Sequence, residues 1–437
     1  SLFSQQTVYV SATGAGSSDG TSEQNAYGNF ANALLDINSN GDKLIVIGTV
    51  TVGAATISDK NFAFTIEGKD ATSTITGSGG TSRLFTLNQA TTIDVTLKDL
   101  TFSNYNTTLA GGGVLFSNNA GATVTFDNCI FTGNSVTNNQ GGGAIFFANG
   151  TLNIIDSSFE SNTSSDEGGA IFANSGTISI SNTLFKTNSA ATKGGAIYTI
   201  NADFTITGST FYDNETTGTG GGSVLYVASS GSTNSISNCT FFQNTTANAN
   251  QDYGTIRTDN GNTTVTNSLF YDNKTNNDTG GTSDWGSGPG GTQTFNTSIA
   301  QWISTNVDNQ DEGTGSITGI KGGTGTPADL TSSNLTFNPT TGKVEYDAVS
   351  FTEHSPIDFG SDGNDVGAWD SGLTLSLDKE DFLATKLSVY YNKSSKILEL
   401  QHTITEPVSI ERRRSLHQQS GGFTYRNNID QSGCAKP

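Results

Sequence analysis

The chain has 437 residues, of which 53 are Gly, 6 are Pro and none is Met, and only 33% are hydrophobic. Such a composition does not fill a broad globular core, so apolar residues must be buried along a narrow, repetitive axis or not at all. The formal net charge is −20, and so acidic a surface repels phosphate backbones and anionic membranes, which argues against nucleic acid as a partner. No run of about 18 apolar residues occurs, so we expect no transmembrane segment.

The first 41 residues are expected to form a strand and a capping helix. Thr7–Ser11 (TVYVS) is rich in β-branched and aromatic residues, which predicts an opening strand. Apolar residues then fall at helical spacing, and this helix is expected to cap the open end of the core: Tyr27, Phe30, Ala31, Leu34 and Leu35. Because the chain does not begin with Met, we interpret residues 1–5 as the remainder of a secretory signal.

Two signatures then recur once in each unit of about 26 to 30 residues. A Gly-Gly-Ala-Ile tetrad begins at Gly142, Gly168 and Gly194, with looser copies at Gly112, Gly221 and Tyr253. Between the tetrads, Phe-x-x-Asn recurs at Phe131/Asn134, Phe159/Asn162, Phe185/Asn188, Phe211/Asn214, Phe241/Asn244 and Phe270/Asn273. With the alternating stretch before each Phe, these signatures predict three strands per unit, stacked into three sheets of an all-β, right-handed parallel β-helix.

Stacking of such coils places equivalent residues in columns. The Phe residues are expected to stack inside, and the Asn residues to form a ladder at a turn, where their amides bond to each other and to the backbone. The paired glycines supply conformations that a β-carbon would penalise. Cys129 and Cys239 fall in one column, four coils and about 19 Å apart by the strand spacing. A disulfide reaches only about 7 Å, so we predict free thiols.

Aromatic residues follow the tetrads directly, and strand alternation puts them outside if the tetrad isoleucines point inward. They are Phe116, Phe146, Phe172 and Tyr198, and a second outward column is Tyr212, Phe242 and Tyr271. Exposed, stacked rings on an acidic exported protein suit sugar rings, so these seven residues are the predicted ligand-binding residues. The alternative is that loops or neighbouring rings cover them.

Catalysis is less favoured by the sequence. A lyase needs a base and a cation or metal, whereas residues 99–280 contain no His, and their basic residues are Lys186, Lys193, Arg257 and Lys274. We therefore assign no catalytic residue. A polysaccharide lyase or glycoside hydrolase acting at the irregular coils or at residues 274–330 is the alternative, and a passive stalk is the third.

Acidic loops are the only candidates for a metal. Asp308 and Asp311, or Asp362 and Asp365, offer oxygen ligands for Ca²⁺, but neither pair has EF-hand spacing. We expect no cofactor, with Ca²⁺ at these loops as the alternative.

The paired signatures resemble the repeats of chlamydial polymorphic outer membrane proteins and related bacterial β-helix surface proteins, over residues 40–300. Residues 354–360 (HSPIDFG) and 365–370 (DVGAWD) are similar to the choice-of-anchor Q segment that closes many pectin lyase-like β-helices. Residues 375–400 are similar to the start of the type A sorting domain of Bacteroidetes type IX secretion. The usual Tyr-Pro-Asn-Pro is here Tyr390-Tyr391-Asn392-Lys393.

Four regions are therefore expected. They are the strand and capping helix (1–41), the β-helix coils (42–300), the terminal coils with the anchor-like segment (301–371), and a degenerate sorting-like module (372–437). The net charge is −22 over residues 1–371 and +2 over 372–437. The resemblance and the outward rings together imply an adhesin-like, non-catalytic monomer at the extracellular or outer-membrane surface of a Gram-negative bacterium. The expected partner is a polysaccharide or a host or cell-surface glycan.

Overall fold

A computed structural model describes residues 5–79, 82–88, 92–218, 220–247, 254–271, 273–275 and 285–296, and the short segments 299–300, 316–318, 335–338, 343–346, 385–392 and 397–404. The chain divides into two compact units, Ser1–Thr374 and Leu375–Pro437. In the second unit, β37 (Thr385–Asn392) and β38 (Ile397–Ile404) form an antiparallel pair. The predicted anchor-like segment lies outside the described residues.

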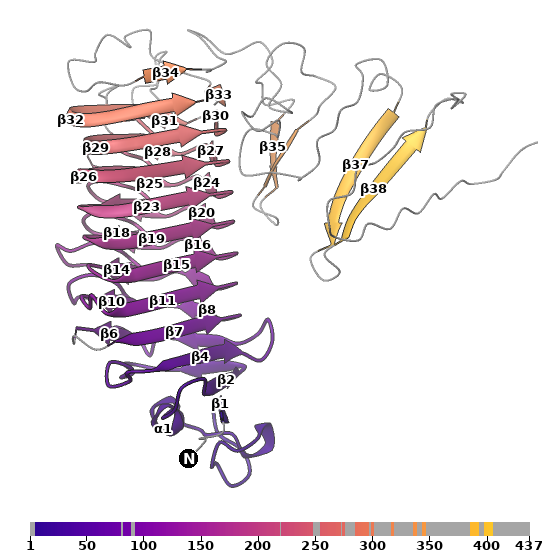
Figure 1. Ribbon diagram of the computed structural model, residues 1–437. Coiled ribbons are helices and arrows are strands. Elements are labelled where there is room, and N and C mark those ends of the chain that lie inside the picture. Colours follow the sequence, from indigo (N-terminus) through magenta and orange to yellow (C-terminus); the bar gives the residue numbers. More distant parts are fainter. Residues whose placement is uncertain are drawn as a thin grey trace, which may run out of the picture. The chain divides into compact units, whose positions relative to one another are not determined.

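The first unit contains a parallel β-helix, which confirms the predicted fold class (Figure 1). A regular coil contributes four strands, for example β14 (Ile145–Phe147), β15 (Thr151–Ile155), β16 (Ser158–Glu160) and β17 (Thr163–Ser164). The tetrad strand β14 and the alternating strand β15 belong to one sheet, β16 to a second and β17 to a third. The prediction of three sheets is correct in number, but the two-residue strands of the third sheet were missed.

The first sheet holds two rows of strands that merge in the later coils. Its tetrad strands are β6 (Phe85–Leu87), β10 (Leu115–Ser117), β14, β18 (Ile171–Ala173) and β22 (Ile197–Thr199). Its alternating strands are β1 (Thr7–Ser11), β2 (Lys43–Ile47), β4 (Ala63–Gly68), β7 (Ile93–Lys98), β11 (Ala122–Asp127), β15, β19 (Gly176–Ser181) and β23 (Ala202–Thr207). Both rows continue in β26 (Leu225–Ser237), β29 (Ile256–Thr266) and β32 (Trp285–Asn296), and β34 (Ser316–Thr318) pairs with β32.

The other two sheets follow the Phe and the Asn of each repeat. The second sheet consists of β3 (Thr49–Thr51), β5 (Thr74–Thr76), β8 (Thr101–Ser103), β12 (Ile130–Thr132), β16, β20 (Leu184–Lys186), β24 (Thr210–Tyr212), β27 (Thr240–Phe242), β30 (Leu269–Tyr271) and β33 (Ile299–Ala300). The third consists of β9 (Asn106–Thr107), β13 (Ser135–Val136), β17, β21 (Ser189–Ala190), β25 (Glu215–Thr216), β28 (Thr245–Thr246) and β31 (Lys274–Thr275).

The repeated Phe residues stack inside the coils, as predicted. Phe159 lies in register with Phe131 and Phe185, with ring centroids 4.3 and 4.9 Å away and interplanar angles of 2° and 4°. These three rings are fully buried. Beside them the alternating strands bury every second residue, so that Ile154, Ile180 and their equivalents form an aliphatic row. The periodicity of the sequence therefore becomes one continuous core.

The repeated Asn residues form the predicted ladder. The Nδ2 of Asn188 donates to the carbonyl of Phe159 and to the Oδ1 of Asn214, both at 2.9 Å. Its Oδ1 accepts from the backbone N–H and the Nδ2 of Asn162, both at 3.0 Å. The same pattern links Asn134 to Asn273 along the axis. Because these amides are buried, each bond replaces one that water would otherwise make.

The tetrad glycines meet two separate requirements. Gly168 has φ +62°, where a side chain is strained. Gly169 instead sits where an added Cβ would lie 2.1 Å from the carbonyl oxygen of Gly195 on the next coil. The first glycine therefore permits the turn, and the second permits the coils to approach.

The N-terminal helix α1 (Phe30–Asp36) is shorter than the predicted helical pattern. Phe30 and Leu34 are buried in the core, and the helix lies at the N-terminal end of the coils (Figure 1). Ala31 and Leu35 are exposed, so their predicted place on the buried face of the helix is wrong. Tyr27 precedes the helix but packs against the core, and its hydroxyl donates to Asp36 at 2.6 Å. Among the described residues, no helix has the length and apolarity needed to cross a membrane.

A buried threonine provides a test of the packing. The Oγ1 of Thr199 has no hydrogen-bond partner, whereas the Oγ1 of Thr216 donates to the carbonyl of Gly222 at 3.0 Å, and both residues are buried. Thr199→Val is expected to raise the free energy of unfolding by about 1 kcal/mol, because an unsatisfied buried hydroxyl is removed. Thr216→Val is expected to lower it by about 1 kcal/mol. Urea unfolding of the two variants checks these opposite signs, and equal shifts would contradict them.

The cysteines of the coils are buried free thiols, as predicted. Cys129 and Cys239 are completely buried, and their thiols donate to the carbonyls of Leu97 at 3.3 Å and Ser237 at 3.2 Å. Burial raises the pKa of each thiol to about 12. Since the thiolate is the reactive form, neither should react at pH 8.

A thiol count tests this burial directly. In a Cys434→Ser background, Ellman's reagent is expected to detect no thiol in the folded protein and two in guanidinium chloride. A thiol that reacts within minutes in the folded protein would show that its coil opens to solvent.

Candidate functional site

The tetrad strands carry a column of aromatic rings on the outside of the first sheet. Phe116, Phe146, Phe172 and Tyr198 lie in register on β10, β14, β18 and β22, and Tyr226 on β26 continues the column. The residues before them point into the main core, and the rings form a separate cluster. The predicted direction of these side chains is therefore confirmed. We call these five residues the outer aromatic column.

The expectation that these rings are exposed is wrong for three of them. Phe146, Phe172 and Tyr198 are only 5–7% exposed, and Phe116 is half-buried. Phe146 stacks on Phe116 and on Phe172 with both centroid distances 4.9 Å and angles of 7° and 14°. Its two faces are therefore occupied by neighbouring rings, and Gly111 lies against it. A sugar ring needs a free aromatic face, so the column is a second core rather than an open platform.

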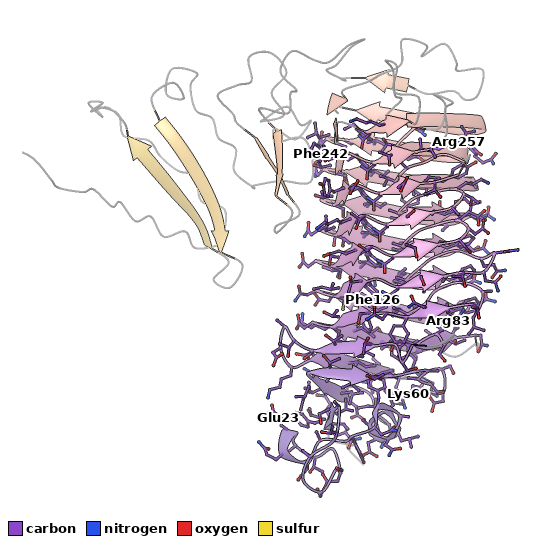
Figure 2. All side chains as sticks on the ribbon, turned by 180° about the vertical axis from the view of Figure 1, so that it is seen from behind. Glu23, Lys60, Arg83, Phe126, Phe242 and Arg257 are labelled. Carbon is purple, nitrogen blue, oxygen red and sulfur yellow. The ribbon has the colours of Figure 1, made fainter. Side chains whose placement is uncertain are left out.

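Cations lie at both ends of this column. The guanidinium of Arg83 is 4.6 Å from the Phe116 ring centroid, and its Nε donates to the carbonyl of Gly112 at 2.7 Å. At the other end Arg257 is 5.8 Å from the Tyr226 ring and pairs with Asp259 at 2.6 Å. Figure 2 labels both arginines, Arg83 towards the N-terminal coils and Arg257 towards the later ones. Cation–π contacts therefore cover a ring at each end of the column, and the carbonyls of Gly111 and Gly112 hold Arg83 in place.

Tyr226 and Arg257 were missed as members of this column because of the tetrad alignment. The sequence has three consecutive glycines at 220–222, and the prediction started the tetrad at Gly221. In the structure Ile197 pairs with Leu225, so the equivalent glycine is Gly222 and the next ring is Tyr226. Arg257 pairs with Tyr226 on the following coil. The available signal was the spacing: Tyr226 lies four positions after Gly222, as Tyr198 lies four positions after Gly194.

A charged group lies beside the tyrosines of the column. Lys193 Nζ is 4.9 Å from the Tyr226 ring and 5.8 Å from the Tyr198 ring. Burial, reinforced by Asp166, raises the pKa of Glu167 to about 7, and Lys193 opposes this rise. Burial also raises the pKa of Tyr198 above its ordinary range. The carboxyl group of Glu167 therefore changes its protonation near neutral pH.

Stability should depend on pH through Glu167. Its folded-state pKa of about 7 exceeds the ordinary 4.5, so the folded protein holds the extra proton and loses stability as pH rises through this window. Glu167→Gln is expected to remove this loss and to stabilise the protein by about 1 kcal/mol at pH 8, the effect being moderated by solvent at a half-buried group. Urea unfolding at pH 4.5 and pH 8 measures it, with Glu160→Gln as the matched control. An equal effect of Glu167→Gln at both pH values would contradict it.

The second outward column is also largely covered. Tyr212 is half-buried, and its ring lies 5.8 Å from that of Phe242 at an angle of 19°. Phe242 is 6% exposed, so the expectation that it is open to ligands is wrong. Tyr271 pairs with Phe242 on the next coil, but its side chain lies outside the described residues.

A different surface of the first sheet is open and polar. The outward residues at the centre of the alternating strands lie in register on successive coils. We call them the outer polar column: Thr65, Thr96, Thr125, Asn153, Ser179, Thr205, Ser235, Thr264 and Thr294. Each is half-buried or exposed, and none is charged. The prediction overlooked this column because it followed the buried half of the alternation, although the same period fixes both faces.

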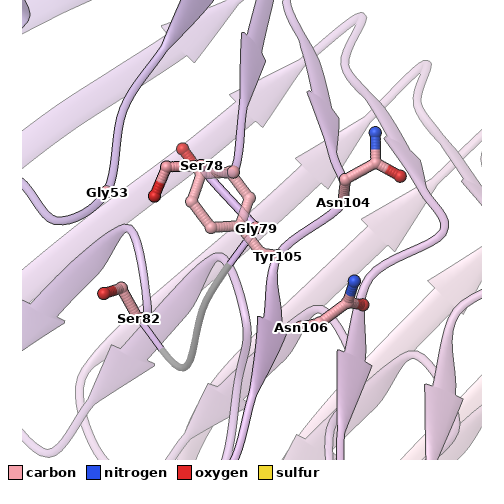
Figure 3. A pocket seen from close by; sticks show the side chains of 8 residues that line it. Gly53, Ser78, Gly79, Ser82, Asn104, Tyr105 and Asn106 are labelled. Atoms are coloured by element: carbon pink, nitrogen blue, oxygen red, sulfur yellow. The ribbon is translucent and has the colours of Figure 1, made fainter.

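The other candidate positions among the described residues form neither a ligand pocket nor a metal site. The hollow in Figure 3, lined by Ser78, Asn104, Tyr105 and their neighbours, has a cavity volume of about 0 Å³ and so admits no ligand, whereas ligand pockets usually exceed about 300 Å³. The Tyr105 hydroxyl donates to the carbonyl of Val52 at 2.9 Å, so it supports the coil. Within the described residues no group of His, Cys, Asp and Glu could hold a metal. The predicted Ca²⁺ candidates Asp308, Asp311, Asp362 and Asp365 lie outside them.

Comparison with known proteins identifies the repeat. Residues 156–174 and 182–200 match the Chlamydia polymorphic membrane protein (Chlamydia_PMP) repeat. Each segment runs from the turn before the Phe strand, through the ladder Asn, to the tetrad strand with its outward ring. A comparison with curated proteins finds no match to the chain. The repeat and the parallel β-helix fit a surface or secreted β-helix protein.

Proposed function

We propose that the chain is an adhesin-like protein that binds a polysaccharide or cell-surface glycan without transforming it. The observation that supports this is the outer polar column, a row of half-buried and exposed hydroxyl and amide groups repeated on successive coils. Such groups donate and accept hydrogen bonds, as sugar hydroxyls do. The repeat match supports a location at the outer-membrane surface of a Gram-negative bacterium, which is part of the same proposal.

The aromatic columns contribute less to this proposal than the sequence suggested. Only Phe116 and Tyr212 are half-buried among the six predicted ligand-binding rings whose side chains are described. Contact of a glycan with the accessible edges of these two rings stays a prediction. The variants Phe116→Ala and Tyr212→Ala test this contact, because they leave the buried rings of both columns unchanged.

Retention on polysaccharides tests the proposed function. The full chain is passed through affinity gels containing cellulose derivatives, β-mannan, soluble chitin derivatives, starch, polygalacturonate or alginate. We expect retarded migration of the chain in at least one gel. Bovine serum albumin serves as the acidic control that does not bind. Unretarded migration in every gel, at polysaccharide concentrations that retard a known binding module, would contradict a glycan-binding role.

A second candidate function is polysaccharide cleavage, and one feature favours it. Glu167, with its pKa of about 7, lies near Lys193 and Tyr198. A carboxyl group that titrates near neutrality beside a cation is suited to general acid–base catalysis. An ultraviolet assay for unsaturated uronate products and a reducing-sugar assay, each with and without Ca²⁺, test this candidate. Activity that Glu167→Gln abolishes would replace the binding role with an enzymatic one.

A further inference from the structure

The outer polar column differs in charge from the rest of the surface. The chain has 40 acidic residues against 20 basic ones, yet nine successive positions of this column are Thr, Ser or Asn. In the row beside it, Asp94 and Asp203 stand on either side of Thr123, Thr151 and Thr177. The row on the other side holds Glu67, Lys98 and Asp127, and Lys43 lies in register with Thr65 at the N-terminal end of the column. Lys43 pairs with Glu67 and Lys98 with Asp127, so these charges balance one another. The face therefore offers hydrogen bonds at its centre and has Asp94 and Asp203 along one margin.

The hydroxyl groups of the column are available to a ligand. Asn153 Nδ2 donates to the Oγ1 of Thr125 at 3.3 Å. Elsewhere in the column, the described hydroxyls make no side-chain hydrogen bond within the protein, and Ser179 and Thr205 are exposed. They lie directly in register on β19 and β23. These two coils form the most accessible part of the column.

The spacing of the column limits the shape of its ligand. Neighbouring strands are about 4.8 Å apart, so one polar group recurs at that interval along the axis of the coils. An extended β-1,4-linked sugar chain advances by a similar distance per residue. A chain lying along the axis therefore meets a hydrogen-bonding group at each sugar, whereas a coiled α-linked chain does not.

Charge limits the ligand further. A polymer of uronates or sulfated sugars would bring a row of negative charges towards an acidic protein and next to Asp94 and Asp203. A neutral polymer carries no such penalty. We infer that the outer polar column binds an uncharged, extended, β-linked polysaccharide chain that lies along the axis of the coils. This inference rests on the proposed glycan-binding function and specifies its site and ligand class.

Substitution of the two exposed neighbours tests the inference. The double variant Ser179→Glu/Thr205→Glu places two carboxylates in the middle of the column. The control Thr163→Glu/Ser189→Glu makes the same change on neighbouring coils of the third sheet, where Thr163 and Ser189 also lie in register. Circular dichroism verifies that both variants fold. The conservative variant Ser179→Thr/Thr205→Ser keeps both hydroxyl groups.

The affinity of the full chain for soluble β-1,4-glucan, β-mannan and polygalacturonate is then measured by affinity electrophoresis. We expect a neutral polymer to bind, the column variant to weaken binding about tenfold or more, and the control and conservative variants to stay within about twofold. Unchanged binding by the column variant would overturn the site while leaving glycan binding intact. Tighter binding to polygalacturonate would overturn the ligand class. No binding to any polysaccharide would overturn both the inference and the proposed function.

Discussion

Asn188→Ala is expected to lower the free energy of unfolding by about 3–5 kcal/mol, because several buried groups lose their partners together. The carbonyl of Phe159 and the Oδ1 of Asn214 lose a donor, and Asn162 loses the acceptor of its backbone and side-chain N–H groups. Each unsatisfied buried group costs about 1–3 kcal/mol, and water has no route to a residue that is completely buried. The effect is measured by urea unfolding followed by circular dichroism.

The matched control for this substitution is Asn153→Ala in the outer polar column. Asn153 makes one long hydrogen bond of 3.3 Å at the surface, so its loss is expected to cost less than about 0.5 kcal/mol. A cost of less than 1 kcal/mol for Asn188→Ala would mean that the amides do not form a continuous buried ladder.

The second large effect is expected at the outer aromatic column. Phe172 is 7% exposed and stacks between Phe146 at 4.9 Å and Tyr198 at 5.0 Å. Phe172→Ala is therefore expected to lower the free energy of unfolding by about 3–4 kcal/mol, as removal of a buried ring does in a protein core. Phe116→Ala, at the half-buried end of the same column, is expected to cost about half as much.

Denaturation of these two variants distinguishes a second core from a binding platform. An exposed platform predicts that Phe172→Ala retains the stability of the wild type and loses ligand binding instead. A cost below about 1 kcal/mol for Phe172→Ala would therefore contradict the burial described above.

The inner part of the fold could be predicted because its signals repeat. Six copies of Phe-x-x-Asn fix the register of successive coils, and a register once fixed places Phe159 on Phe185 and Asn162 on Asn188. The same register separates Cys129 from Cys239. Repetition in sequence becomes repetition in space because each coil contacts only its neighbours.

The covering of the outer rings could not be predicted in the same way. Whether the rings of this column are exposed depends in part on cations that lie over its ends, Arg83 on Phe116 and Lys193 on Tyr226. Hydrophobic periodicity predicts the direction of a side chain, but it does not predict which other residues cover that side chain. The two-residue strands such as β17 were missed for a related reason, because two residues are too few to display a period.

The central claim is that ligands bind at the outer polar column and that the aromatic columns chiefly stabilise the coils. Affinity electrophoresis of Ser179→Glu/Thr205→Glu and of Phe116→Ala/Tyr212→Ala in the same neutral β-linked polysaccharide tests this claim most directly. We predict that the first variant loses most of its retardation, as an affinity about tenfold weaker requires, and that the second keeps most of the wild-type retardation. Loss of retardation in the ring variant together with normal retardation in the polar variant would contradict the account.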